Sequence, residues 1–163
     1  MIGLGFRPFT AGDKNACMDI LMSNTPRYFG VEDADEYRDF LDSPTCDYFV
    51  VTQNDTIVAC GGHGFHDRKQ AFILAWGMVR ADLHKHGLGK FLLTERLKKI
   101  CSDFSDSLVK IETSQHSRGF FERFGFKTTN IIPNHFAPGI DRVDMELRLT
   151  AEQYRTLAQK DIR

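Results

Sequence analysis

Two glycines, two histidines and two lysines crowd the stretch between residues 84 and 90, which reads HKHGLGK. An apolar run at 71–79 precedes it and an amphipathic run at 89–104 follows, so the sequence predicts a strand, a short loop and a helix. The first backbone N–H groups of a helix have no intrahelical partner and lie at the positive end of the helix dipole. Gly87 and Gly89 would let an anionic oxygen approach them, because neither carries a Cβ. We therefore predict a phosphate site here, the alternative being that the glycines only shape a tight turn.

Three side chains could accept a proton at a reacting centre. Glu112 lies in a predicted strand at 107–114, on the face opposite Ile111, where partial burial would raise its pKa. The alternative for Glu112 is an ion pair with Lys110 or with a neighbouring strand. His63 and His116 are the other candidate bases, although a histidine at a strand end is more often exposed or simply hydrogen-bonded.

Four cysteines are scattered along the chain without a Cys-x-x-Cys pair, at positions 17, 46, 60 and 101. This pattern predicts free buried thiols rather than disulfides or a zinc site. Cys46 and Cys60 could donate a proton, but core packing is the simpler role. Cys60, His63 and His66 are spaced by threes, which places His63 on the other side of an extended chain from its neighbours. No metal site is predicted.

The elements that must position these residues follow from hydrophobic periodicity and from capping and turn residues. We predict strands at 4–9, 71–79, 107–114, 125–132 and 142–149, a hairpin at 46–65 around Asn54-Asp55, and helices from Asp13 to Pro26, at 31–44, 89–104, 117–124 and 150–160, the last capped by Thr150 with Glu152 near the capping-box position. This order indicates a mixed α/β sheet flanked by helices rather than a barrel or a bundle.

Length and composition narrow the class of protein. With 163 residues, of which 42% are hydrophobic, the chain suits a single domain spanning residues 1–163. The formal charge of −1 gives no general reason to expect nucleic acid or an anionic membrane as a partner. No window approaches the ~20 continuous apolar residues of a membrane span, and Arg7 interrupts the apolar N-terminal run, unlike a secretory signal. We expect a cytoplasmic protein.

The stretch 78–93 resembles the pyrophosphate loop of the GNAT acetyltransferase superfamily. That loop reads Gln or Arg, two variable residues, Gly, one variable residue, then Gly or Ala, after a strand that ends in Val and usually a Pro. The matching positions here are Val79, Ala81, His84, Gly87 and Gly89. A second stretch, 113–126, is similar to the family's later helix and its Tyr-x-x-x-Gly-Phe ending, with Phe121, Gly125 and Phe126 at that spacing. The spacing of the glycines matches neither the Walker nor the Rossmann fingerprint.

The resemblance implies a GNAT-like, mostly antiparallel central sheet that splays at an acetyl-CoA site. It implies the pyrophosphate on 84–90, the pantetheine arm beside 76–79 and the thioester between that strand and 107–113. The implied CoA-binding residues are Met78, Val79, His84, Lys85, His86, Gly87, Leu88, Gly89, Lys90, Ser114 and Phe121. The acceptor would be a primary amine that attacks the thioester directly, without an acyl-enzyme, while a backbone N–H near Met78 or Val79 meets the oxyanion.

Three positions depart from the family pattern. His84 replaces Gln or Arg, and Ser114 stands where many members carry an Asn that contacts the pantetheine arm. Phe121 stands at the position of the Tyr that is credited with protonating the departing thiolate. The identity of the general acid is therefore open.

The acceptor end of the family fold corresponds to residues 23–44 and 130–145. Acidic residues at this end would favour a cationic amine: Glu32, Asp33, Asp35, Glu36, Asp141 and Asp144. Alternatively, the acids at helix starts only interact favourably with the helix dipole, and Asp82, Asp141 and Asp144 are simply solvated. Tyr28, Phe29, Trp76 and Phe136 could form an apolar wall. A small polyamine-like or amino-acid amine, a peptide N-terminus and a protein lysine all remain open as acceptors.

Two other function classes fit the same residues: a non-catalytic acyl-CoA-binding or sensing domain, and an interaction protein with an empty loop. A homodimer is also considered, because residues 143–149 alternate as an edge strand would.

Overall fold

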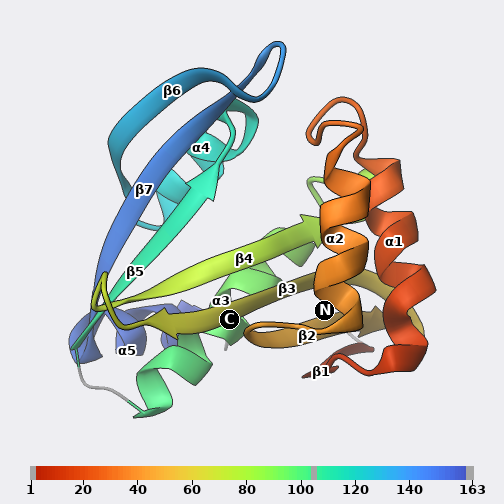
Figure 1. Ribbon diagram of the computed structural model, residues 1–163. Coiled ribbons are helices and arrows are strands. Elements are labelled where there is room, and N and C mark those ends of the chain that lie inside the picture. The colour runs from red at the N-terminus through yellow and green to blue at the C-terminus, as the bar shows by residue number, and fades with distance from the viewer. Residues whose placement is uncertain (1–2, 104–105, 161–163) are drawn as a thin grey trace.

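The computed structural model describes residues 3–103 and 106–160, which form one seven-stranded sheet with helices on its faces (Figure 1). The elements are β1 (Leu4–Pro8), η1 (Ala11–Asp13), α1 (Lys14–Ser23), α2 (Asp33–Asp42), β2 (Asp47–Gln53), β3 (Thr56–His66), β4 (Ala71–Val79), η2 (Ala81–Leu83), α3 (Leu88–Asp103), β5 (Asp106–Thr113), α4 (Gln115–Arg123), β6 (Lys127–Ala137), β7 (Ile140–Thr150) and α5 (Ala151–Lys160). No helix in these ranges is long and apolar enough to cross a membrane.

The strands follow the order β1-β2-β3-β4-β5-β7-β6, and every neighbouring pair is antiparallel except β4 and β5. These two central strands pair only at Phe72–Val109 and Ile73–Lys110. Beyond that point they diverge, so the sheet divides into a first wing, β1–β4, and a second wing, β5, β7 and β6 (Figure 1). The predicted mixed, mostly antiparallel and splayed sheet is confirmed.

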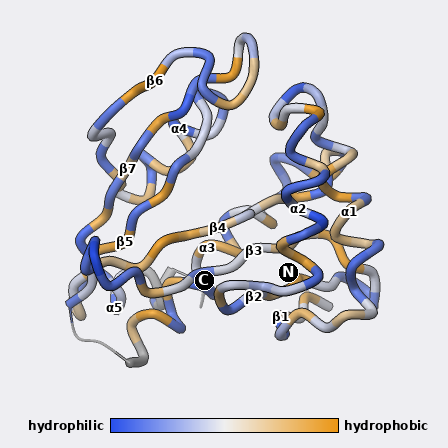
Figure 2. Tube along the Cα trace, viewed as in Figure 1, coloured by the Kyte–Doolittle hydropathy of each residue, from blue (hydrophilic) through white to orange (hydrophobic). Residues whose placement is uncertain are grey.

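Separate apolar clusters cover the two faces of the sheet. α1 and α2 pack on one face of the first wing, over side chains that include Tyr37, Tyr48 and Met78. α3 and α4 cover the opposite face, where Leu97 and Val109 join the largest cluster. The apolar residues follow the strands, continuous along β4 and alternating along β7 (Figure 2). The alternation leaves the other face of the second wing polar.

Several predicted boundaries move in the structure. The helix expected at 31–44 spans only Asp33–Asp42, and the strand expected at 125–132 continues to Ala137, so β6 and β7 form a long hairpin. The pairing of these two strands shifts register twice. Such shifts, together with the Pro, Gly and Asn residues of the hairpin, interrupt the alternation by which a strand is recognised in the sequence. β7 lies between β5 and β6, so its predicted role as an edge strand is wrong; β1 and β6 form the edges. The alternating apolar and polar residues of β7 reflect one buried and one polar face of the strand. A homodimer stays a prediction.

Two predicted caps also differ. At the start of α5, Thr150 forms its reciprocal capping bonds with Gln153 rather than with Glu152. Asp13 precedes α1, but its carboxylate accepts hydrogen bonds from the Arg7 guanidinium (2.7 and 2.9 Å) and from the Thr10 N–H (2.8 Å) instead of capping the helix. Asp13 thus ties the start of α1 to β1.

This contact should make stability depend on pH. The hydrogen bonds from Arg7 hold the pKa of Asp13 at about 2, below its usual value. A carboxylate whose pKa is lower in the folded than in the unfolded protein stabilises the fold at pH values above its unfolded pKa of about 4. This stabilisation is lost as the pH falls toward the folded pKa of about 2. Because Arg7 is half exposed, we expect Asp13→Asn to cost only about 1 kcal/mol at pH 6 and almost nothing at pH 2. Urea unfolding at both pH values measures this, and Asp35→Asn, in an exposed pair with Arg38, is the control that should change neither value. A cost for Asp13→Asn that is equal at both pH values would contradict the prediction.

Candidate functional site

The loop between β4 and α3 presents backbone donors at the open end of β4. After η2 the chain turns through Lys85 (φ 65°) and Gly87 (φ 83°), and the Phe91 N–H donates to the Gly87 carbonyl (3.0 Å) as α3 begins. No described residue accepts a hydrogen bond from the backbone N–H groups of 85–90. Three of these N–H groups, 88–90, lie in the first turn of α3 and three in the turn before it, and unpaired N–H groups at a helix start can bind an oxyanion such as a phosphate.

The two glycines of this loop have different reasons to be there. Gly87 adopts a positive φ, which any side chain would strain. Gly89 has no such requirement, because a Cβ there would lie 3.6 Å from the Phe120 ring and 3.9 Å from Val79, both ordinary contacts. The packing of the protein alone therefore does not demand a glycine at 89. A ligand that approaches the start of α3 would.

The imidazole of His84, which was predicted to contact a phosphate, has a hydrogen-bond partner within the protein. Its Nε2 lies 2.9 Å from the Val79 carbonyl, which also accepts a hydrogen bond from the Asn24 side chain (2.9 Å). A carbonyl only accepts, so Nε2 carries the hydrogen and Nδ1 faces any other partner. Nδ1 can therefore donate to a phosphate only when the imidazole is protonated. Lys85, His86 and Lys90 are exposed around the loop.

A bulge in β4 lies beside the opening between the wings. β3 and β4 pair at Cys60–Met78 and again at Gly62–Ala75, which leaves Trp76 and Gly77 out of register. Trp76 has a φ of 47°, and its carbonyl accepts a hydrogen bond from the Tyr48 hydroxyl (2.8 Å). Bulges of this kind redirect the backbone groups that follow them. The N–H groups near Met78 and Val79, predicted to meet an oxyanion, follow this bulge directly.

The two predicted contacts from the later helix lie at its start and in the core. Ser114 is buried and forms the N-cap position of α4. Phe121 is also buried, with its ring edge-on to those of Phe126 (5.3 Å) and Phe120 (5.1 Å). The side chain at the usual Tyr position is therefore part of the apolar core, and it supplies no proton.

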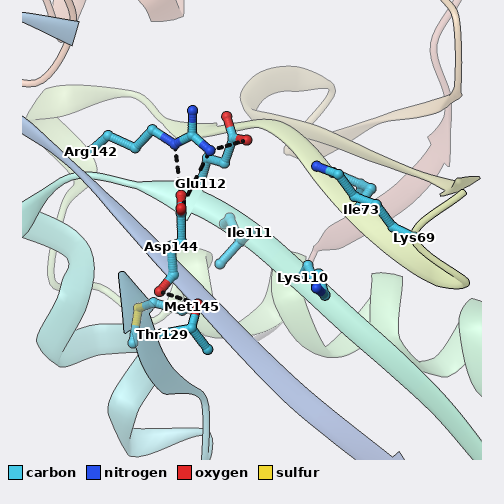
Figure 3. Close-up of a pocket in the computed structure, with 9 residues that line it drawn as sticks. All are labelled: Lys69, Ile73, Lys110, Ile111, Glu112, Thr129, Arg142, Asp144 and Met145. Carbon is cyan, nitrogen blue, oxygen red and sulfur yellow. Dashed lines mark hydrogen bonds and ion pairs between the residues drawn. The ribbon is translucent and has the colours of Figure 1, made fainter. Parts of the chain in front are cut away.

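Glu112, the first candidate base, takes part in an ion pair with a neighbouring strand, the alternative that the sequence left open. Arg142 on β7 places one nitrogen 2.9 Å from Glu112 and another 2.7 Å from Asp144 (Figure 3). Asp144 was expected to be solvated, which is wrong, because pairing with Arg142 partly buries it. Lys110 pairs instead with Glu146 (3.7 Å). Glu112 keeps 44% of its side chain exposed, so it remains reachable from the opening.

These charges line a pocket of about 110 Å³ where β4 and β5 diverge. The lining residues are Lys69, Ile73, Lys110, Ile111, Glu112, Thr129, Arg142, Asp144 and Met145 (Figure 3). The pocket is smaller than the roughly 300 Å³ at which sites for whole small molecules begin. Its lining carries three cations, Lys69, Lys110 and Arg142, beside the carboxylates of Glu112 and Asp144, so it can take only a small polar part of a substrate.

The two histidine candidates lie in unlike places. His63 is buried with its ring stacked on Phe49 (5.5 Å), a ring that Lys99 of α3 also covers. His63 therefore lies in the core beside α3, whereas Glu112 is exposed, and a role for His63 as a base stays a prediction. His116 is exposed at the start of α4.

The α1–α2 loop spans the mouth between the wings. Tyr28 places its ring edge-on to both His84 (5.3 Å) and His116 (5.5 Å), and these histidines belong to the two sides of the opening. Phe29 stacks on Trp76, and Gly30 lies so close to the β6–β7 hairpin that a Cβ would be 3.3 Å from Ala137. The two segments predicted at the acceptor end thus meet. Asp33 accepts a hydrogen bond from the Gly30 N–H (2.8 Å), and burial raises its pKa, so this acid also has a local structural role.

Sequence reasoning missed Asn24 and Arg142, whose contacts are described above, and Arg96, which is buried on α3. Arg96 could have been noticed, because it falls on the apolar face of the predicted 89–104 helix. In the described part of the chain, no three or more His, Cys, Asp or Glu residues are grouped to hold a metal ion.

The family model described as an acetyltransferase (GNAT) domain matches residues 23–149, which include the loop, the splayed strands and the acceptor end. The chain belongs to the GNAT family. No curated protein sequence gives a significant match.

Solved structures share this GNAT fold at low sequence identity. A GNAT-family protein from Desulfovibrio desulfuricans aligns with a TM-score of 0.76 at 21% identity, over 89% of this chain and 98% of that one. The ribosomal-protein-S18-alanine N-acetyltransferase of Escherichia coli gives 0.74 at 16% identity (90% and 94%). An aminoglycoside 6'-N-acetyltransferase in complex with coenzyme A gives 0.70 at 16% identity (88% and 96%). At these identities the likeness concerns the fold.

Proposed function

We propose that this GNAT protein transfers the acetyl group of acetyl-CoA to a primary amine by direct attack within a ternary complex. The observation that carries the proposal is the row of six N–H groups at 85–90, with no protein acceptor among the described residues, next to the bulged, open edge of β4. That arrangement fits a pyrophosphate whose attached arm runs along β4 toward the opening. The coenzyme A in the aminoglycoside acetyltransferase structure supports the choice of ligand.

The proposed reaction needs three things from the site. The amine lone pair forms a bond to the thioester carbonyl carbon, and the carbonyl oxygen takes negative charge that an N–H near Met78 or Val79 meets. The carbon–sulfur bond then breaks, and its electron pair leaves with the CoA thiolate. An ammonium acceptor first gives one proton to Glu112 or to water, which frees the lone pair, and the nitrogen gives a second proton to water after it has bonded to the carbonyl carbon. Holding both substrates in place can account for up to ~7–11 kcal/mol of the barrier.

The acceptor end favours a cationic amine. Glu32 and Glu36 lie at the start of α2, beside the loop that spans the mouth. On the facing wing Glu112 and Asp144 share the charge of Arg142, so the two carboxylates leave a net negative charge there. Phe29 and Trp76 supply an apolar wall for the carbon skeleton. The aminoglycoside and ribosomal-protein-alanine enzymes, which share the fold, act on amines of very different size. The proposal therefore names the amine and leaves its carrier to a screen.

A panel of amines incubated with acetyl-CoA tests the proposal through the release of free thiol. We expect thiol release with at least one amine that carries a positive charge. Tight CoA binding without thiol release from any amine would favour the non-catalytic acyl-CoA-binding domain. Absence of CoA binding would favour the interaction protein.

Glu112→Gln is expected to lower kcat about 100-fold with an accepted amine and to leave the KM for acetyl-CoA unchanged, because a general base typically contributes that much. The fold should persist, since Arg142 keeps its bond to Asp144. Glu146→Gln is the matched control: it removes a paired carboxylate from the neighbouring strand β7, on the same face of the sheet, and should leave kcat within twofold. An equal loss of kcat in Glu112→Gln and Glu146→Gln would show that Glu112 acts only through the total charge of the second wing and not as a base.

A further inference from the structure

Arg96 is a buried cation on the face of α3 that packs against β3 and β4. Its residue is 3% exposed, its Nη1 donates to the Gly62 carbonyl (3.2 Å) and its Nε to the Leu92 carbonyl (3.4 Å). No carboxylate among the described residues lies within ion-pair distance of it. Burying an arginine without an acid is costly, so the position of its charge calls for an explanation.

Two glycines provide the space for this guanidinium. A Cβ on Gly61 would lie 3.2 Å from its central carbon, and a Cβ on Gly77 would lie 3.0 Å from Nη2. Gly77 belongs to the β4 bulge, so the guanidinium lies against the backbone of the bulge itself. Any side chain at Gly77 would push the charge away.

Hydroxyl and thiol groups fix the bulge from the opposite face. The Tyr48 hydroxyl donates to the Trp76 carbonyl (2.8 Å), lies 2.6 Å from the Tyr37 hydroxyl, and belongs to a cluster in which Tyr37 also reaches the Cys60 sulfur (3.3 Å). The bulge is therefore held between a polar cluster and a guanidinium. This rigid setting matches the requirement for preorganised charge near a reacting centre.

The charge of Arg96 persists at neutral pH. Burial lowers its pKa to about 10, which still leaves it protonated. The titratable groups that face it are Cys46, Tyr48 and Cys60. Burial raises the pKa of Cys46 to about 11 and that of Tyr48 well above its usual value, so both are neutral. Burial opposes ionisation of the Cys60 thiol, while hydrogen bonds with Cys17, Tyr37 and Tyr48 act in the other direction and lower its pKa.

We propose that Arg96 is a positioning residue for acetyl transfer: through the Trp76–Gly77 bulge it stabilises the negative charge that forms on the thioester oxygen and on the departing CoA sulfur. The inference rests on the proposed function. It also offers a replacement for the hydroxyl that Phe121 lacks, because a cation beneath the bulge would favour the thiolate form of the sulfur that leaves when the carbon–sulfur bond breaks. Protonation can then follow from water after the bond has broken.

Ionisation of bound CoA tests this without any acceptor. The thiolate of CoA absorbs in the ultraviolet, so its fraction can be followed against pH in complexes with wild type, Arg96→Met and Arg96→Lys. We expect the bound thiol to titrate ~1 pH unit higher in Arg96→Met, a tenfold change in the thiol–thiolate equilibrium, and Arg96→Lys to restore most of the difference. Arg148→Met, which removes an exposed arginine from β7, should leave the titration as in wild type.

Desulfo-CoA, which lacks the sulfur, separates charge from shape. We expect it to bind wild type and Arg96→Met equally, and kcat with an accepted amine to fall 10- to 100-fold in Arg96→Met with the KM for acetyl-CoA little changed. If Arg96→Met does not fold, Gly77→Ala should displace the guanidinium and raise the titration of the bound thiol in the same direction.

Two results would overturn the proposal. One is that the bound thiol titrates at the same pH in wild type, Arg96→Met and Arg96→Lys. The other is that both variants lose desulfo-CoA binding, because Arg96 would then only shape the site. Failure of the proposed function gives a different result. If no amine releases thiol, the titration of bound CoA still decides whether Arg96 acts on the sulfur.

Discussion

Gly89→Val is expected to weaken CoA binding at least ~100-fold, as measured by calorimetric titration, because the added side chain would occupy the approach to the N–H groups at the start of α3. Without ligand the substitution should shift Tm by only a few degrees. A Cβ at this position meets only the partly exposed Phe120 ring and Val79, both at ordinary contact distance. The loss should therefore appear in binding far more than in folding.

Gly119→Val is the matched control for this experiment. Gly119 lies in α4 and is exposed, and no described residue comes within 4 Å of the place that a Cβ would take, so valine there tests the general cost of the substitution in a helix. It should bind CoA as wild type does. Equal CoA affinities for wild type and Gly89→Val would remove the 84–90 loop from the proposed site.

Phe121→Ala is expected to lower the free energy of unfolding by about 3–5 kcal/mol, through the cavity it would leave in the core. In a domain of this size that corresponds to a Tm lower by roughly 10 °C. The ring it removes is buried against Phe120 and Phe126, in the same cluster as Leu147. Urea unfolding and melting curves measure the loss. A cost below about 1 kcal/mol would show that Phe121 is not the core residue described here.

Phe121→Tyr separates packing from chemistry at the same position. If Arg96 already allows the thiolate to leave, an added hydroxyl should raise kcat less than the ~100-fold that a well-placed general acid often contributes. The buried hydroxyl should also cost some stability unless it finds a partner. If wild type releases no thiol with any amine while Phe121→Tyr does, the natural protein is better described as a CoA-binding domain without its catalytic acid.

Local patterns were enough to predict the fold class and the turn between β4 and α3, where the phosphate site stays a prediction. The period of the apolar residues marked β4 and α3, and two glycines between them marked a turn that exposes backbone donors. Both signals arise within about twenty residues of chain, and local geometry depends little on what packs around it. For the same reason the sequence placed Phe121 inside a helix, although it ended the preceding strand at Ser114, which is the N-cap of α4 in the structure.

The side chains that could do chemistry were harder to place. Glu112 was the first candidate to accept a proton and His63 an alternative; in the structure His63 lies beneath α3, whereas Glu112 opens to the space between the wings. Which face of a strand is buried depends on the helices that cover it, and these come from elsewhere in the chain. The partner of Glu112 could not be foreseen either, because the β5–β7 register that brings Arg142 to it joins residues about thirty positions apart.

The sequence by itself therefore determined the family resemblance, the order of the elements and the donor-rich loop, since each rests on short-range spacing. Only the tertiary structure decided that β4 and β5 pair at two positions and then part, that Tyr28 spans their mouth, and that Arg96 lies beneath the β4 bulge with no acid beside it among the described residues. These features arise where segments distant in the chain compete for the same space. Packing density and the cost of burying charge, rather than local propensity, settle that competition.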